Sequence, residues 1–243
     1  MTDGMYAVVP AAGEGTRLRP LTESTPKGLL EVAGKPILSR CFDRLCEVDV
    51  EEIVVVVGYL GDQVVDYYGD AYRGTPIRYV RQHERKGLAH AIAQAEDVVD
   101  GDFLVVNGDN VLGTDLEAVL ETQRRPDVDA ALLVEEASLE VAATTGVLEV
   151  SDDGRVTGIT EKPEEPSSTL VTTGVYALSE VIFEHCRTIS PSARGEYELA
   201  DAIDRLLEAG GVVEHVELEG WRVNVNRPAD LEKASRRLED TER

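Results

Sequence analysis

A glycine-rich loop that carries several cations stands near the start of the chain. It reads Ala11-Ala12-Gly13-Glu14-Gly15-Thr16-Arg17-Leu18-Arg19-Pro20. Glycine lets backbone N–H groups approach a ligand without a Cβ in the way, and a strand that ends in such a loop can cradle phosphate oxygens. Arg17, Arg19 and Lys27 fall within eleven residues of a chain that is otherwise strongly acidic. This local reversal of charge predicts that the loop binds an anion.

Two familiar phosphate-binding motifs do not fit this loop. A dinucleotide fingerprint requires a third glycine where Leu18 stands, and the Gly-Lys-Ser/Thr of a Walker loop is absent from the run. A NAD-dependent oxidoreductase is therefore a distant alternative. The remaining alternative is a surface turn with incidental basic residues.

A second motif, Asn107-Gly108-Asp109-Asn110, follows the apolar run 103–106. A carboxylate at the C-terminal end of a parallel strand lies where open α/β sheets bind ligands. Mg²⁺ takes one or two protein carboxylates together with substrate phosphates, which a lone Asp109 would suit. By itself this motif is more often a turn, and its position after the strand favours a metal site.

A third motif runs from Gln82 to Ala91 and includes Gly87. A glutamine side chain offers both a donor and an acceptor, so it can pair with the edge of a pyrimidine. The alternative is an exposed glutamine between a strand and a helix. His83 and His90 have no third ligand at metal spacing, and we assign them no chemistry.

A fourth group lies in the second half of the chain, where Glu161-Lys162-Pro163 ends one β-rich run and Thr172-Thr173-Gly174 lies in the next. Taken alone, Glu161 and Lys162 could be a solvated ion pair of little consequence. The distribution of lysine argues otherwise, because the chain has 19 Arg and only five Lys. Three of these lysines fall inside the motif segments and a fourth adjoins the first motif, which leaves only Lys233 outside them. Since a compact ammonium does not replace a guanidinium, the retained lysines suit the geometry of a site.

The elements that must position these motifs alternate between strand and helix in the first half. Strands are expected at 6–10, 53–57, 77–81, 103–106 and 130–135, and helices at 37–48, 62–68, 88–98 and 115–124. Such alternation favours right-handed crossovers and a mostly parallel sheet.

The order of the expected elements changes in the second half of the chain. There the sequence Ser151-Asp152-Asp153-Gly154 predicts a hairpin turn between the β-rich runs 147–150 and 155–160. Strands at 170–178, 212–218 and 221–225 and helices near 179–187, 197–209 and from Pro228 complete the chain. No linker or internal repeat interrupts it, so we expect one α/β domain over residues 1–243 with a more antiparallel second half.

The composition of the chain restricts the classes of molecule that it can bind and indicates the salt concentration at which it works. With 47 Asp plus Glu against 24 Lys plus Arg, the 243 residues carry a formal net charge of −23. This charge disfavours nucleic acids and anionic membranes, and the longest aliphatic run, 53–57, is far too short to span a bilayer. Carboxylate excess and scarce lysine favour a halophilic protein, because salt screens the self-repulsion. An acidic mesophilic protein is the alternative.

Three cysteines, Cys41, Cys46 and Cys186, form neither a CxxC motif nor an even set. We expect free thiols in a reducing, cytoplasmic setting. The first residues lack the pattern of an export signal, so no export is expected.

Taken in their order along the chain, the motifs resemble those of the nucleoside-diphosphate-sugar pyrophosphorylases, the sugar-1-phosphate nucleotidyltransferases, over residues 5–235. The similarity is greatest to the haloarchaeal glucose-1-phosphate uridylyltransferase and thymidylyltransferase branch. It implies a Rossmann-like, mostly parallel mixed sheet flanked by helices. It also implies a nucleotide-binding half, about 1–110, and a sugar-phosphate-binding half, about 111–243.

The resemblance also implies roles for individual residues. Arg17 would steady the transition state, Lys27 would contact phosphates, and Asp109 would bind Mg²⁺. The residues implied to hold the nucleotide are Ala11, Ala12, Gly13, Gly15, Thr16, Gln82 and Gly87. Those implied to hold the sugar phosphate are Gly146, Glu161, Lys162 and Thr173.

The closing run Trp221-Arg222-Val223-Asn224-Val225-Asn226 departs from the family pattern. Asn224 replaces the usual metal-binding aspartate, and Asn226 replaces the usual glycine. An asparagine still offers Mg²⁺ a carbonyl oxygen, so Asn224 remains the second expected ligand, but it lacks the charge. A non-catalytic nucleotide-sugar-binding homologue is therefore the alternative of another class.

The expected reaction joins a nucleoside triphosphate to a sugar 1-phosphate, and pyrophosphate leaves. UTP and glucose 1-phosphate are favoured by the overall resemblance, with dTTP as the close alternative, because a pocket discriminates one methyl group by only about 1–3 kcal/mol. No hexapeptide repeat follows the last helix, so no acetyltransferase activity is expected. A homo-oligomer is possible.

Overall fold

β-Branched, apolar runs form the inner strands of the protein, as their composition requires. The computed structural model describes residues 5–241. These residues form two compact units, each discontinuous in sequence and treated separately below. The first comprises residues 5–85, 106–116 and 219–241, and the second comprises residues 86–105 and 117–218.

This grouping differs from the expected halves at residues 86–105, 111–116 and 219–241. The single domain and its two halves remain predictions.

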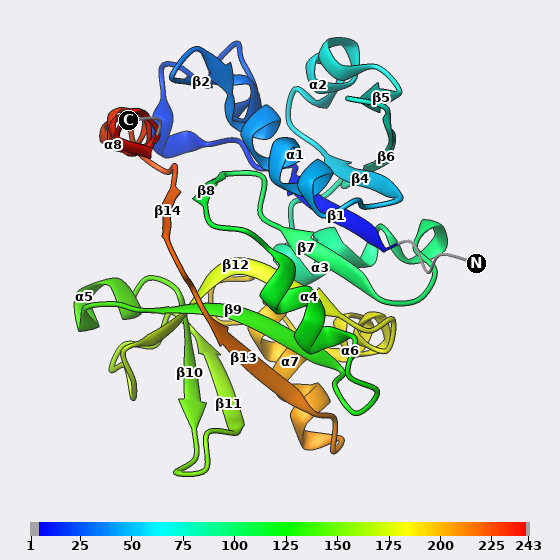
Figure 1. Ribbon diagram of the computed structural model, residues 1–243, viewed down its shortest axis with the longest axis vertical. Helices are drawn as coiled ribbons and strands as arrows, with labels where there is room; N and C mark the ends of the chain where they lie inside the picture. Colours follow the sequence, from blue (N-terminus) through cyan, green and yellow to red (C-terminus); the bar gives the residue numbers. More distant parts are fainter. Residues whose placement is uncertain (1–4, 242–243) are drawn as a thin grey trace. The chain divides into compact units, whose positions relative to one another are not determined.

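Three parallel strands form the centre of the first unit (Figure 1). β4 (Glu52–Val57) pairs with β1 (Tyr6–Ala11) on one side and with β6 (Thr75–Arg81) on the other. The five consecutive residues 53–57 of β4 are fully buried, so both faces of this strand are covered, as the apolar run predicts. β5 (Ala71–Tyr72) adds an antiparallel pair to β6.

Two further strand pairs and three helices complete this unit. α1 (Ile37–Glu47) and α2 (Gly61–Tyr68) lie close to their predicted ranges. β14 (Trp221–Asn224) pairs antiparallel with β8 (Asn110–Gly113) and leads into α8 (Pro228–Thr241), drawn from orange to red in Figure 1. A cluster of seven buried residues, which includes Leu18, Val111 and Val223, packs beneath them.

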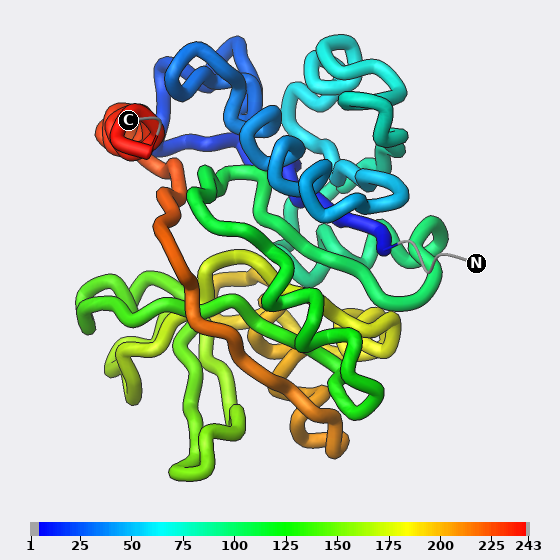
Figure 2. Tube along the Cα trace, in the orientation of Figure 1, coloured from blue at the N-terminus to red at the C-terminus, as the bar shows by residue number. Residues whose placement is uncertain are grey.

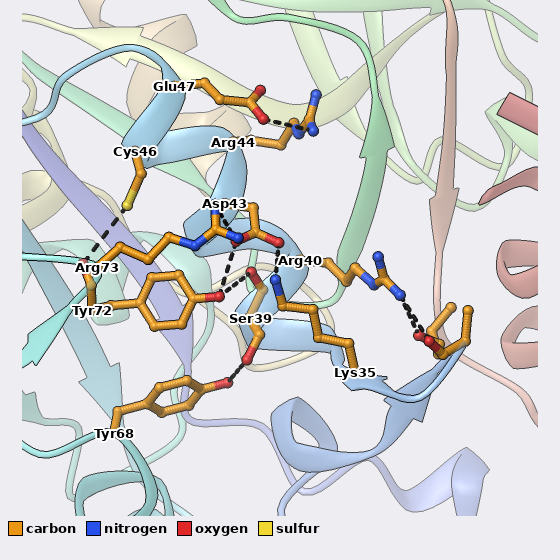
Figure 3. A network of polar contacts seen from close by, with 12 residues as sticks. Lys35, Ser39, Arg40, Asp43, Arg44, Cys46, Glu47, Tyr68, Tyr72 and Arg73 are labelled. Atoms are coloured by element: carbon orange, nitrogen blue, oxygen red, sulfur yellow. Dashed lines mark hydrogen bonds and ion pairs between the residues drawn. The ribbon is translucent and has the colours of Figure 1, made fainter. Parts of the chain in front are cut away.

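Polar contacts anchor α1 to the segments around it (Figure 3). The Asp43 carboxylate pairs with Lys35 and Arg73 and accepts a hydrogen bond from the Tyr72 hydroxyl at 2.9 Å. Arg40 donates to two carbonyl oxygens of the hairpin formed by β2 (Glu31–Val32) and β3 (Lys35–Pro36). These contacts fix the hairpin and β5 against one helix.

The second unit is mainly antiparallel, as expected. Its longest strand, β12 (Leu170–Leu178), pairs antiparallel with β9 (Ala130–Glu136) and with β10 (Gly146–Val150), and it also neighbours β7 (Phe103–Val106). The predicted hairpin joins β10 to β11 (Val156–Glu161), and its turn lies at the lower end of the trace in Figure 2. β13 (Val213–Glu217) runs parallel to β9.

The helices of the second unit are short. They are α3 (Leu88–Ala93), α4 (Glu117–Gln123), α5 (Leu139–Ala142), α6 (Ile182–Thr188) and α7 (Leu199–Glu208). The helix expected over 88–98 ends early, because hydrogen bonds from Ala95 to Ile92 and from Val98 to Ala95 tighten the chain into a 3₁₀ turn at Glu96–Val98. Five short elements were not predicted from the sequence, since elements of two to four residues show no periodicity: β2, β3, β5, β8 and α5.

The α/β fold class is confirmed, with parallel strands in the first unit and mostly antiparallel strands in the second. All three cysteines are free, and two of them, Cys41 and Cys186, are buried. Among residues 5–241, no helix combines the length and the apolar character needed to cross a membrane.

Candidate active site

The glycine loop after β1 is held by its second glycine. Gly15 adopts the left-handed region, with φ 61° and ψ 40°, where a side chain would be strained. Its carbonyl oxygen accepts hydrogen bonds from the Leu18 N–H and the Thr22 hydroxyl, both at 2.8 Å. A Cβ at Gly15 would lie 3.3 Å from Cβ of Lys27, so this glycine also lets Lys27 approach the loop. Gly13 lies outside the left-handed region and faces open space.

Lys27 and Asp109 form an ion pair in the first unit, with 2.8 Å between Nζ and Oδ2. Their side chains are 14% and 28% exposed, so the pair is only partly accessible to water. Asp109 is placed by Gly108, whose N–H donates to the Pro10 carbonyl at 3.1 Å. A Cβ at Gly108 would lie 2.9 Å from that oxygen, so only glycine allows this approach. The pair therefore joins the segment that carries Gly108 and Asp109 to the segment after the glycine loop.

The closing motif adds two asparagines to this ion pair. Lys27 Nζ also donates to Asn226 Oδ1 at 3.0 Å, and Arg17 reaches the same oxygen at 3.4 Å. Asn226 Nδ2 in turn donates to Asn224 Oδ1 at 2.8 Å. Asn226 thus connects four predicted site residues, Arg17, Lys27, Asp109 and Asn224, although Asn226 was not itself predicted as a site residue.

Gln82 lines a cavity of about 160 Å³ within the first unit. The glutamine is 5% exposed, and its backbone N–H donates to the Val57 carbonyl at 2.9 Å. The other residues that line the cavity are Val57, Gly58, Tyr59, Arg81, His83 and Arg85. The lining is largely polar, and its two arginines are paired with Asp62 and Glu14, so it suits a small neutral polar ring.

Glu14 was not predicted as a site residue, yet it connects the glycine loop to the segment that follows Gln82. Its carboxylate pairs with Arg85 at 2.5 Å and with Arg19 at 3.4 Å. An acidic residue between two glycines, within reach of nearby arginines, is the signal that could have indicated this pairing.

Gly87 belongs to the second unit, where packing alone accounts for its identity. Its φ is 107°, and a Cβ would lie 2.5 Å from the Tyr197 carbonyl oxygen. The Ala89 N–H donates to that same oxygen at 3.0 Å, and the Tyr197 N–H donates to the Lys86 carbonyl at 2.6 Å. The contact of Gly87 with a base remains a prediction.

Glu161 and Lys162 lie at the end of β11 in the second unit, with 2.9 Å between Oε1 and Nζ. Lys162 has a positive φ of 49°, a strained conformation for a lysine, and its N–H donates to the Thr145 carbonyl at 2.9 Å. Burial raises the pKa of the Glu161 carboxyl, while the nearby Lys162 charge acts in the opposite direction. Gly146 lies opposite, where a Cβ would come within 3.2 Å of Glu161 Oε2.

Thr173 is 1% exposed and lies in an irregular part of β12. Three residues of β12, 173–175, oppose one residue of β9 there, and the Thr173 hydroxyl donates to the Leu133 carbonyl at 2.7 Å. The hydroxyl thus stabilises the bulge in β12. The neighbouring Gly174 has a positive φ of 83°. A direct contact of Thr173 with sugar remains a prediction.

A buried carboxylate that was not predicted lies near Glu161. Glu198 is 5% exposed and accepts hydrogen bonds on Oε1 from Arg194 at 2.9 Å and from Ser192 at 3.0 Å. Its charge contributes to the raised pKa of Glu161, and Arg194 opposes it. The available signal was Arg194, a cation four residues before Glu198.

A family model described as nucleotidyl transferase matches residues 6–241. The chain belongs to the nucleotidyl transferase family. It is 48% identical to the UTP–glucose-1-phosphate uridylyltransferase AglF of Haloferax volcanii, over 97% of each chain. It is 36% identical to the glucose-1-phosphate thymidylyltransferase of Streptomyces antibioticus, over 98% of this chain and 67% of that protein.

The fold of this nucleotidyl transferase resembles that of a crystal structure of UDP-glucose pyrophosphorylase complexed with UDP-glucose. The TM-score is 0.88, the sequence identity is 25%, and the match covers 98% of this chain and 99% of that one. The expected resemblance and the Rossmann-like mixed sheet are therefore confirmed.

Whether this nucleotidyl transferase can hold a divalent metal is tested by its donor set. Residues 5–241 contain no group of three or more His, Cys, Asp or Glu side chains placed to hold a metal ion. Asp109 and Asn224 instead supply a carboxylate and an amide oxygen, joined through Lys27 and Asn226. Oxygen donors are those that Mg²⁺ prefers, and the small number suits an ion that keeps waters and substrate phosphates as ligands. The residues fit such an ion.

Proposed function

We propose that this nucleotidyl transferase moves the uridylyl group of UTP onto glucose 1-phosphate and releases pyrophosphate. The observation that carries the proposal is the Lys27–Asp109 pair beside the glycine loop, with Arg17 and Asn226 attached to it. The 48% identity to a uridylyltransferase supports UTP and glucose 1-phosphate as the substrates.

Each unit would bind part of the substrates. In the first, the loop residues Ala11, Ala12, Gly13, Gly15 and Thr16 would hold the triphosphate, and Gln82 would pair with the base. In the second, Gly146, Glu161 and Lys162 would hold the sugar phosphate, with Gly87 contributing to the base and Thr173 to the shape of β12. Glu161 can accept hydrogen bonds from sugar hydroxyls, and Lys162 can pair with the phosphate.

In the reaction, a phosphate oxygen of the sugar 1-phosphate attacks the α-phosphorus of UTP. The new bond joins this oxygen to phosphorus, the bond from the α-phosphorus to the bridging oxygen breaks, and pyrophosphate leaves with that electron pair. The nucleophile is already an anion, so no general base is needed. The main obstacle is repulsion between two polyanions, at about 1 kcal/mol for each pair of unit charges 4 Å apart in water.

The cations of the chain would offset this repulsion. Lys27 and Arg17 meet the triphosphate side and Lys162 meets the sugar phosphate, so catalysis is mainly positioning and electrostatic stabilisation. Asp109 and Asn224 would hold Mg²⁺, which supplies further neutralisation of phosphate charge when bound.

A thymidylyl transfer from dTTP is the second candidate, favoured by the 36% identity to a thymidylyltransferase. The remaining proposals concern the setting: a halophilic cytoplasm, no nucleic-acid or membrane partner, and possible homo-oligomers.

The test is pyrophosphate release at high KCl with Mg²⁺. UTP, dTTP, CTP and GTP are each paired with glucose 1-phosphate, galactose 1-phosphate and N-acetylglucosamine 1-phosphate. The expected result is fastest turnover with UTP and glucose 1-phosphate. Preference for dTTP would replace the first candidate by the second. Tight nucleotide binding without turnover for any pair would identify a non-catalytic binding protein.

A further inference from the structure

One side-chain amide lies at the centre of the contacts in the first unit. Asn226 Oδ1 accepts hydrogen bonds from Lys27 Nζ at 3.0 Å and from Arg17 Nη2 at 3.4 Å. Its Nδ2 donates to Asn224 Oδ1 at 2.8 Å. Asn226 thus contacts two cations and one proposed metal ligand at the same time.

The chemistry of the partners fixes which way this amide points. Lysine and arginine side chains only donate hydrogen bonds, so the oxygen of Asn226 must face Lys27 and Arg17. Its NH₂ group then faces Asn224, so Asn224 must present its oxygen, the acceptor, to this group. The orientation of one amide therefore determines the orientation of the other, and Asn224 turns its oxygen toward this group of residues.

The backbone around Asn226 is held from two directions. The N–H of the preceding Val225 donates to the Asp109 carbonyl at 2.9 Å. The N–H groups of Asn226 and Arg227 both donate to Asp230 Oδ2 at 2.8 Å, at the start of α8. The side chain of Asn226 therefore projects from a fixed point, which is what a group that positions others requires.

The neutrality of this acceptor has an electrostatic consequence. Asp109 already offsets one of the two positive charges of Lys27 and Arg17. A second carboxylate at position 226 would offset the other and leave no net positive charge for phosphate. An amide oxygen holds both cations in place without removing their charge.

We propose that Asn226 is a positioning residue of this enzyme. It holds Lys27 and Arg17 for the phosphates of the nucleotide, keeps their net charge positive, and turns the Asn224 oxygen toward the metal. The inference rests on the proposed function for the identity of the ligand and adds a residue to that site.

The first experiment measures binding without metal or turnover. Isothermal titration calorimetry in EDTA follows UTP, and tripolyphosphate as a second probe, with the wild type, Asn226→Ala and Asn226→Asp. Asn226→Asp has the same shape but cancels the remaining positive charge, so we expect Kd to rise at least about tenfold for both probes. Asn226→Ala keeps the charge, so we expect a change of less than about threefold.

Turnover separates positioning from binding. For Asn226→Ala we expect kcat to fall about 10- to 100-fold with the KM for UTP within about threefold, because the cations lose their shared acceptor. Ser235→Ala is the matched control on α8, where Ser235 Oγ accepts a hydrogen bond from the Ala33 N–H at 3.1 Å. It removes a polar contact of the helix that follows Asn226 and should leave kcat unchanged.

A double-mutant cycle tests the orientation of Asn224. Mn²⁺ binding is measured by electron paramagnetic resonance in the presence of α,β-methylene-UTP, which cannot turn over. Asn226→Ala should weaken Mn²⁺ binding about three- to tenfold. In the Asn224→Asp background the same change should have less than a twofold effect, because a carboxylate presents oxygen in either orientation.

Equal Kd values for Asn226→Asp and the wild type, with an unchanged kcat for Asn226→Ala, would overturn the inference while the proposed function stands. Equal losses of Mn²⁺ binding in the two backgrounds would remove the role toward Asn224. If the wild type binds neither UTP nor tripolyphosphate, Lys27 and Arg17 form no phosphate site and the inference fails. Turnover absent from a wild type that binds UTP overturns only the proposed reaction.

Discussion

The Nζ atom of Lys27 lies 2.8 Å from Oδ2 of Asp109, although 82 positions separate the two residues in the chain. The contact joins the turn after the glycine loop to the segment that follows β7 (Phe103–Val106). It brings together a cation and a carboxylate that the sequence analysis had assigned to different tasks, phosphate binding and metal binding. Because each holds the other, a change in either should affect both tasks.

Replacing Lys27 by arginine tests whether the ammonium itself is required. One ammonium donates to both Asp109 and Asn226, at 2.8 and 3.0 Å, and a planar guanidinium cannot reproduce this geometry in the same space. We expect Lys27→Arg to lower kcat about 10- to 100-fold although the charge is conserved. The control is Lys233→Arg, at the one lysine outside the motif segments, which should turn over at the wild-type rate. Full activity of Lys27→Arg would show that charge alone suffices.

Asp109→Asn removes the carboxylate that pairs with Lys27. We expect kcat to fall by about 100-fold or more, because both the metal and Lys27 lose a charged partner. The fold should survive, since breaking one partly exposed ion pair costs about 1–2 kcal/mol. Pyrophosphate release and the midpoint of thermal unfolding are measured on the same preparation. A wild-type rate would exclude Asp109 from the metal site, and a collapse of the unfolding transition would give it a structural role.

Gln82→Ala tests the proposed reading of the base. The glutamine is buried at the wall of the 160 Å³ cavity, and its amide offers a donor and an acceptor to a pyrimidine edge. We expect the KM for UTP to rise about tenfold and the preference for UTP over CTP and GTP to shrink. Gln94→Ala removes a glutamine that donates to the His90 carbonyl at 3.0 Å, and it should leave the preference intact. Unchanged selectivity in Gln82→Ala would mean that base recognition lies elsewhere.

Elements with clear periodicity were predictable from the sequence, whereas contacts between distant segments were not. The buried run 53–57 and the hairpin at Ser151–Gly154 carry their own signals, and both are confirmed. The place of Asp109 after a strand was enough to predict it as a metal ligand, and that role remains a prediction. The contacts of Asn226 could not be predicted in this way, because they involve two cations about 200 positions away, and local pattern holds no information about such contacts.

Glu161→Gln should raise stability while weakening the binding of sugar phosphate. Burial raises the pKa of this carboxyl, so the folded protein holds the proton more tightly than the unfolded chain does. The stability that comes from the protonated form is therefore present below the ordinary value of 4.5 and is lost as pH rises through the raised pKa. A glutamine at position 161 carries no ionisable proton, so the Glu161→Gln variant does not lose this stability as pH rises.

The expected result is a higher unfolding midpoint for Glu161→Gln than for the wild type at neutral pH, with a difference that shrinks as pH falls toward 4.5. The KM for the sugar phosphate should rise about tenfold, because a charged acceptor is lost. Glu165→Gln, at an exposed glutamate of the same segment, is the control. A lower midpoint for Glu161→Gln at neutral pH would mean that the ion pair with Lys162 outweighs burial.

The net charge of −23 leads to a prediction about salt. At about 0.1 M KCl the Debye length is about 10 Å, so carboxylates on neighbouring elements repel one another, whereas at about 1 M it falls to about 3 Å. Surface ion pairs such as Arg124–Glu117 are screened as well, but each contributes at most about 1 kcal/mol. With 23 more acidic than basic side chains, repulsion outweighs these pairs, and KCl should raise the unfolding midpoint up to molar concentrations. Thermal unfolding between 0.1 and 3 M KCl measures this, with sucrose as a control that stabilises without screening. A midpoint that stays constant or falls with KCl would contradict the halophilic interpretation and favour an acidic mesophilic protein.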